Sequence, residues 1–183
     1  MKGAIPMPVS NTLSRGSTRW LCVSGLFMAL NIALSSSIFS IPVPGGHLYV
    51  NDIVIDTAAI LLDPLAAFLV GGVGAFLGDF FFYPAPMFVS LVTRGLQAVA
   101  ISLIAHRTLK ERPIIASALG VTVGAVINVV GYSLGRAFVY GTPEAALLKL
   151  PYQVLMAVGG GAIALLLCWK FGLLKLFRKW SET

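Results

Sequence analysis

Long apolar runs, separated by short breaks rich in proline, glycine or charge, dominate this sequence. A transmembrane helix needs roughly 20 consecutive apolar residues, and most of the runs approach that length. The exception is the second run, which is too short to span a bilayer alone and ends at Asp63-Pro64. The pattern predicts an all-α membrane protein, a compact bundle of six transmembrane helices. The predicted helices cover about residues 20–39, 51–62, 65–82, 87–105, 113–138 and 151–170.

The composition excludes a soluble domain. Hydrophobic residues make up 57% of the chain and charged residues only 11%, whereas a soluble domain carries about 25% charged residues. The net charge of +6 does not indicate nucleic-acid binding, because the basic residues lie at the ends of the apolar runs. The two cysteines lie within apolar runs and form no cluster with histidine, so the sequence suggests neither a metal site nor a disulfide framework.

The positive charges predict the orientation of the bundle. Lysine and arginine are concentrated near both termini and in the turn at residues 106–112, and cytoplasmic loops carry such an excess. Both termini are therefore expected in the cytoplasm. The predicted organisation is a cytoplasmic segment at residues 1–19, a membrane domain at 20–172 and a basic tail at 173–183 that lies on a membrane surface. The loops expected at 40–50, 83–86 and 139–151 then face outward.

A few polar residues interrupt the apolar runs. Asp79 lies near the end of the third predicted helix, and Arg94 lies about two turns into the fourth. In the fifth, Asn128, Tyr132 and Arg136 are spaced four apart and share one stripe. Ionisable groups inside a membrane are costly and usually face inward. Two interpretations remain open for them: hydrogen bonds between helices, or contacts with a ligand.

With both termini inside, the polar and aromatic residues gather in the outer half of the bundle. This placement predicts an outward-opening pocket, because small-molecule sites between helices are mostly apolar with a few fixed polar groups. The candidate substrate-binding residues are His47, Tyr49, Asn51, Asp79, Tyr83, Arg94, Gln97, Asn128, Tyr132, Arg136, Tyr152 and Gln153.

The sequence lacks the common catalytic motifs. It contains no GxxxxGK[ST] phosphate loop, no HExxH and no GxSxG, so an enzyme is not expected. A stand-alone secondary transporter is the main alternative, although the two halves show no inverted repeat. One outward pocket in a six-helix bundle favours a binding subunit that obtains energy from a partner.

Several short motifs together resemble the substrate-binding S-components of energy-coupling factor (ECF) type ABC transporters, a vitamin-uptake family. The resemblance covers about residues 20–172. One departure is Asp63, where related sequences commonly have glycine. The motifs are Ala29-x-x-x-Ala33, the IPVPGG segment followed by Tyr49-Val50-Asn51-Asp52, Leu61-Leu62-Asp63-Pro64, Leu77-Gly78-Asp79, and Arg94-Gly95, where relatives often have Lys-Gly.

The resemblance implies a function that the residue spacing alone does not give. S-components sit in the prokaryotic plasma membrane and bind a vitamin or precursor near its outer side, without a cofactor. They dock on a transmembrane coupling subunit through a small-residue face of the first helix, here Ala29 and Ala33, and two cytoplasmic ATPases supply the energy. The motifs are closest to the branch for riboflavin, pyridoxine and hydroxymethylpyrimidine, with cobalamin also possible.

Overall fold

The computed structural model describes residues 15–36, 41–43, 46–109 and 111–182, and it is an all-α protein apart from one short hairpin. Three long helical segments each contain a π-helical turn, so each of them consists of two or three of the elements named below. The elements are α1 (Thr18–Leu34), β1 (Ile41–Val43), β2 (Gly46–Leu48), α2 (Asp52–Leu61), α3 (Pro64–Phe68), η2 (Leu69–Val73), α4 (Gly74–Phe82), α5 (Met87–Arg107), α6 (Pro113–Gly135), η3 (Arg136–Tyr140), α7 (Pro143–Leu165), η4 (Leu166–Lys170) and α8 (Leu173–Glu182).

Four of the helical segments are long and apolar enough to cross a membrane: 64–82, 87–107, 113–140 and 143–170. Their outward surfaces are rich in exposed apolar side chains, among them Phe138 and Leu155, and α1 likewise exposes Leu26. α1 is apolar but has only 17 residues, and the end predicted for it, Phe39, lies outside the described residues. This surface suits a protein surrounded by lipid, because it exposes apolar side chains that are unfavourable in contact with water.

Two predicted loops are wrong. The segment expected as an irregular loop at 40–50 contains the antiparallel pair β1 and β2, in which Pro42 lies opposite His47. A two-stranded hairpin tolerates proline because each strand has a free edge. The loop expected at 139–151 is mostly helix, since α6 continues to Tyr140 and α7 begins at Pro143.

The start of α7 has a local cause that the prediction overlooked. The Thr142 hydroxyl accepts a hydrogen bond from the backbone N–H of Ala145 at 3.3 Å, and Pro143 occupies the first helical position. Threonine at the cap followed by proline is a strong start signal. Pro151, which was expected to open the helix, lies inside it and removes one backbone hydrogen bond without ending it.

The Asp63-Pro64 break was predicted correctly as a helix start. The Asp63 carboxylate accepts from the backbone N–H of Leu65 at 3.3 Å and from the Trp20 indole N–H at 2.6 Å. Arg15 donates to the same carboxylate at 2.9 Å. Asp63 therefore both caps α3 and ties the start of α1 to the break after α2.

α2 is the interior helix of the bundle. It has only ten residues, and Ile55, Ala58 and Ile60 are fully buried. It packs against α1, α5 and α7. Because neighbours surround it, a polar residue on α2 faces protein and not lipid. This position allows it to carry the charged groups described below.

Glycines let the helical segment 64–82, made of α3, η2 and α4, approach its neighbours closely. A Cβ on Gly71 would lie 2.8 Å from the Ala98 Cβ of α5, and one on Gly72 would lie 3.0 Å from the Gly95 Cα. On the other side, Gly74 meets α1, where a Cβ would lie 2.8 Å from the Asn31 amide nitrogen. The small-residue face of this segment therefore packs against other helices of the same chain.

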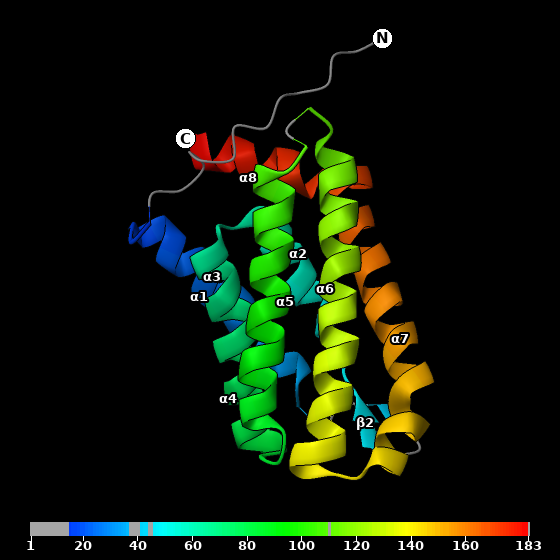
Figure 1. Ribbon diagram of the computed structural model, residues 1–183. Helices are drawn as coiled ribbons and strands as arrows, with labels where there is room; N and C mark the ends of the chain where they lie inside the picture. Colours follow the sequence, from blue (N-terminus) through cyan, green and yellow to red (C-terminus); the bar gives the residue numbers. More distant parts are fainter. Residues whose placement is uncertain (1–14, 37–40, 44–45, 110, 183) are drawn as a thin grey trace.

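The bundle has two distinct ends (Figure 1). The start of α1, the α5–α6 connection and α8 lie at one end, and the hairpin, the α4–α5 turn and the α6–α7 connection lie at the other. α8 crosses the first end with Leu173, Leu174 and Phe177 packed against the core. The same helix also carries lysines and an arginine. It therefore combines apolar and basic residues, and α8 is amphipathic.

Candidate functional site

A cavity of about 60 Å³ lies at the hairpin end of the bundle, where α2, α4, α5, α6 and α7 converge. Most of its lining side chains are polar or charged, although they come from apolar helices. The lining residues are Leu48, Tyr49, Asn51, Asp52, Ala75, Asp79, Arg94, Asn128, Tyr132, Arg136, Lys149, Gln153 and Met156.

The centre of the site is an ion pair between Asp52 of α2 and Arg94 of α5. Their side chains are only 5% and 8% exposed. Asn128 donates to the Asp52 carboxylate at 2.9 Å, and Gln97 lies 3.4 Å from the same oxygen. Arg94 also donates to the Asn51 amide oxygen at 3.3 Å. Further hydrogen bonds of this kind allow a buried ion pair to persist.

A second buried carboxylate extends this network away from the cavity. Asp56 lies one turn after Asp52 on α2 and accepts a hydrogen bond from Gln97 at 2.9 Å. Gln97 in turn accepts from Arg94 at 3.1 Å. Its side chain therefore bridges the guanidinium and both carboxylates, and it contacts the site from behind without lining the cavity.

The predicted stripe on α6 does face the cavity. Asn128, Tyr132 and the first residue of η3, Arg136, all line it. The Arg94 guanidinium lies 5.2 Å from the centre of the Tyr132 ring, within range of a cation–π interaction. The Tyr132 hydroxyl donates to Ser90 at 2.6 Å, and Ser90 donates to Asp79. A chain of polar contacts thus joins α6, α5 and α4.

Three atoms of cavity-lining residues are buried without a hydrogen-bond partner: Arg94 Nε, Asn128 Oδ1 and Arg136 Nη1. Most buried polar atoms in proteins are paired, so each exception needs an explanation. These three supply two donors and one acceptor at the wall of one cavity. These three atoms would therefore be available for hydrogen bonds to a ligand in the cavity.

The structure brings together eight of the twelve predicted binding residues around the cavity. Those eight are Tyr49, Asn51, Asp79, Arg94, Asn128, Tyr132, Arg136 and Gln153. Burial raises the pKa of Tyr49, with Asp79 and Tyr83 adding to the shift, so its hydroxyl stays protonated at neutral pH. Gln153 donates to the backbone carbonyl of Asn128 at 3.1 Å, which fixes α7 against α6.

Of the other four predicted residues, the three whose side chains the structure describes do not line the cavity. Gln97 lies behind Arg94, as described above. Tyr83 and Tyr152 are 47% and 37% exposed on the bundle surface. His47 belongs to β2, and its side chain lies outside the described part of the structure. The two predicted partner residues, Ala29 and Ala33, are exposed on α1.

The list of candidates also omitted important residues. Asp52 and Asp56 carry the central network, and Ser90 and Lys149 contribute at its edges. The spacing of the two aspartates, four apart in an otherwise apolar segment, was a signal for a shared inward face. Ser90 and Lys149 had no comparable signal, because serine is common in membrane helices and Lys149 lay in an expected loop.

The site shows no arrangement for a bound metal. Among the residues that the structure describes, no group of three or more histidine, cysteine, aspartate or glutamate side chains is placed to hold an ion. Asp52 and Asp56 are both occupied by side-chain donors. The site supplies hydrogen-bonding and charged groups in apolar surroundings, which suits reversible binding of a small polar molecule.

Comparison with known proteins places the chain in a family. No curated protein matches it. The family model described as "ECF-type riboflavin transporter, S component" matches residues 15–172, which is most of the chain and contains every lining residue of the cavity. The resemblance drawn from the sequence motifs is thereby confirmed. The chain belongs to the family of ECF-type riboflavin transporter S components.

Proposed function

We propose that this chain is the substrate-binding subunit of an ECF-type importer and takes up a B-group vitamin or a vitamin precursor. The observation that carries the proposal is the buried polar cavity with its three unpartnered atoms. Leaving a polar group buried and unpaired costs about 1–3 kcal/mol of stability. A ligand that pairs them recovers that cost when it binds.

The chemistry of these atoms suggests the form of the substrate. Arg94 Nε and Arg136 Nη1 offer N–H donors, and Asn128 Oδ1 offers an acceptor. A heterocycle edge that carries carbonyl oxygens and a ring N–H complements this set. Riboflavin, the substrate after which the family is named, has such an edge in its pyrimidinedione ring. We therefore expect riboflavin or a closely related heterocycle to bind.

We further propose that six helical segments lie in the membrane, with α1 and the short buried α2 completing the set, and that both termini are cytoplasmic. The support is the distribution of charge between the two ends of Figure 1. The end that carries α8 includes Arg107, Lys175 and Lys179, in keeping with the positive-inside rule. The cavity at the hairpin end then opens to the outside, where an imported vitamin is captured. Cysteine labelling from either side of the membrane tests this orientation.

The chain itself performs no chemistry in this proposal. A transmembrane coupling subunit binds the exposed Ala29 and Ala33 face of α1, and two cytoplasmic ATPases supply the energy. Co-expression with candidate subunits and affinity purification tests the assembly. Uptake by vesicles that contain this chain alone, without ATP, would instead identify it as a stand-alone carrier.

The binding proposal is tested by purification in detergent, mass spectrometry of retained small molecules, and titration with B-group vitamins. A ligand at 100 times its dissociation constant stabilises the protein by roughly 2.7 kcal/mol, so a thermal shift reports binding. We expect riboflavin to bind and Asn128→Ala to weaken it by about tenfold, because one acceptor is worth on the order of 1 kcal/mol.

Thr122→Ala is the matched control for that variant. Thr122 is an exposed polar residue on the same helix, and its hydroxyl bonds only to the backbone carbonyl of Ala118 in the preceding turn. The control should bind as tightly as the parent protein. If no vitamin binds the parent, or if Asn128→Ala and Arg94→Ala bind every candidate unchanged, the cavity is not the substrate site.

A further inference from the structure

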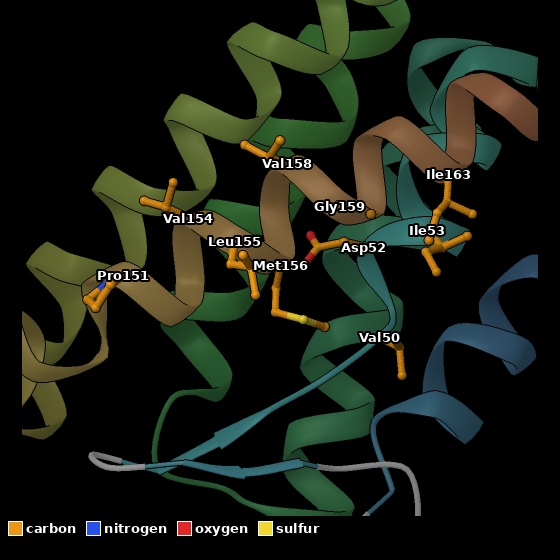
Figure 2. A pocket seen from close by; sticks show the side chains of 11 residues that line it. Val50, Asp52, Ile53, Pro151, Val154, Leu155, Met156, Val158, Gly159 and Ile163 are labelled. Carbon is orange, nitrogen blue, oxygen red and sulfur yellow. The ribbon is translucent and has the colours of Figure 1, made fainter.

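The outward side of α7 shows the kind of surface that the membrane-spanning segments present to lipid. An apolar groove of about 590 Å³ runs along this helix (Figure 2). Val154, Leu155 and Val158 line it, and each of these side chains is exposed. Side chains of this kind contact acyl chains, which do not distinguish one phospholipid headgroup from another. Recognition of a lipid class therefore needs charged groups at the level of the headgroups.

The chain turns at Gly172, and α8 lies across the end of the bundle (Figure 1). Gly172 has a φ of +73°, a backbone conformation that glycine adopts without strain. Its carbonyl oxygen accepts hydrogen bonds from the backbone N–H groups of Lys175 and Leu176 at 2.9 and 3.0 Å, which starts α8. The apolar face of α8 then packs against the core, as described above. The tail that the sequence placed on a membrane surface therefore uses its main apolar face within the protein.

Two further stripes follow the rest of the circumference of α8. Lys175 and Lys179 are four residues apart and form a basic stripe, and Leu176 and Trp180 form an apolar one. With 3.6 residues per turn, the Leu176–Trp180 stripe lies between the core-facing residues and the lysines. All four side chains are exposed, Leu176 by 66% and Trp180 by 44%. An exposed apolar stripe thus borders directly on a basic one.

The start of α1 lies beside this part of α8. The Arg19 guanidinium is 5.7 Å from the centre of the Trp180 ring, within range of a cation–π interaction. The Phe177 ring, which packs against the core, lies 6.2 Å from the Trp180 ring. Two residues after Arg19, Leu21 is 57% exposed, so the apolar outer surface of α1 begins close to Trp180. A tryptophan placed between a basic group and an apolar surface is typical of the membrane–water interface.

The two segments carry charge of one sign only. Residues 15–22 and 170–180 contain no acidic residue. Clusters of four to eight lysines and arginines on an amphipathic helix favour anionic lipids. Because the main apolar face of α8 is used within the bundle, charge supplies most of the attraction to a membrane. The basic residues are Arg15, Arg19, Lys170, Lys175, Arg178 and Lys179.

We propose that α8 and the start of α1 form a binding surface for the headgroups of anionic phospholipids. Leu176 and Trp180 lie at the membrane–water interface, and the basic groups of Lys175, Lys179 and Arg19 surround the lipid phosphate. The apolar stems of the lysines lie along the lipid while their ammonium groups reach the headgroups. This surface is independent of the proposed vitamin site, which lies at the opposite end of the bundle (Figure 1).

The test uses Trp180 as a reporter in the full chain, reconstituted in phosphatidylcholine vesicles. Brominated phosphatidylglycerol, which is anionic, or brominated phosphatidylcholine is added in increasing amounts, and bromine quenches the fluorescence of a tryptophan that it contacts. The difference between the parent and Trp180→Phe isolates the signal of Trp180. Both leaflets have the same composition, so the result does not depend on the orientation of the bundle. A lysine near an anionic surface contributes roughly fivefold to binding. We therefore expect half-maximal quenching by the anionic lipid at a mole fraction lower by roughly fivefold or more.

The double variant Lys175→Gln/Lys179→Gln should lose most of this preference, and Lys175→Arg/Lys179→Arg, the matched control, should keep it because the charges remain. Higher salt should weaken the preference in the parent. Equal quenching by the two lipids in the parent, or an unchanged preference in the glutamine variant, would overturn the proposal. Absence of quenching by either lipid would also overturn it, because the basic face of α8 would then be open to an acidic protein surface instead. Vitamin binding should be the same in the parent and in every one of these variants.

Discussion

The ion pair between Asp52 and Arg94 gives the sharpest prediction about stability. Both side chains are more than nine-tenths buried, and removing one partner of a buried pair costs about 3–5 kcal/mol because it leaves the other charge uncompensated. Arg94→Met removes the guanidinium but leaves Asp52 two amide donors, from Asn128 and Gln97. We therefore expect a loss near the lower bound, about 3 kcal/mol in the free energy of unfolding.

Asp52→Asn removes the opposite charge with little change in shape. Arg94 then has only neutral partners, which are the amide oxygens of Asn51, Gln97 and the substituted side chain and the face of the Tyr132 ring. The double variant removes both charges and should be no less stable than the worse single variant. Residues in contact typically couple by 0.5–3 kcal/mol, and we expect a coupling energy of about 2 kcal/mol here.

The measurement is the unfolding free energy in detergent without ligand, by titration with a denaturing detergent, for the parent, both single variants and the double. Arg107→Gln is the control, because Arg107 is an exposed arginine at the end of the same helix. It should change stability by less than about 0.5 kcal/mol. Additive effects of the two single variants, with no coupling, would refute the conclusion that the pair acts as a unit.

Two further predictions concern packing and capping, both measured as thermal unfolding in detergent. Gly71→Ala should cost about 1–3 kcal/mol, since its Cβ would lie 2.9 Å from the Arg94 carbonyl oxygen on α5, whereas Gly25→Ala, with open space, should be tolerated; equal effects would contradict the close approach. Asp63→Ala should cost about 1–2 kcal/mol, because α3 loses its cap and Trp20 its acceptor, and Asp63→Asn should recover part of it; no loss in Asp63→Ala would contradict this role.

Much of the fold followed from the spacing of apolar runs and breaks. The break at Asp63-Pro64 was predicted, because helix capping acts locally. The hairpin and the start of α7 were not predicted. Proline and glycine in residues 41–46 excluded helix but did not reveal pairing, and the Thr142-Pro143 start signal was outweighed by Gly141 and Pro151 nearby.

The residues of the site were also predictable only in part, because only some of them follow a local pattern. The stripe of Asn128, Tyr132 and Arg136 follows helical periodicity, which a sequence displays directly. The pairing of Arg94 with Asp52 depends instead on which helices are neighbours, and 42 positions separate the two residues. The sequence indicated only that Arg94 needs a partner. In the structure, both terminal nitrogens of Arg94 are engaged by protein, and only Nε lacks a partner.

The short helix α2 explains why charge can be placed so deeply in this bundle. A spanning helix would expose part of its circumference to lipid, where an aspartate costs several kcal/mol. With ten residues, and with α1, α5 and α7 around it, α2 presents Asp52 to donors from two other helices and Asp56 to Gln97. The same position puts Asp52 at the wall of the polar cavity. A ligand in that cavity would thus contact the residue on which the central network of the bundle depends, so ligand binding is expected to raise the stability of the bundle.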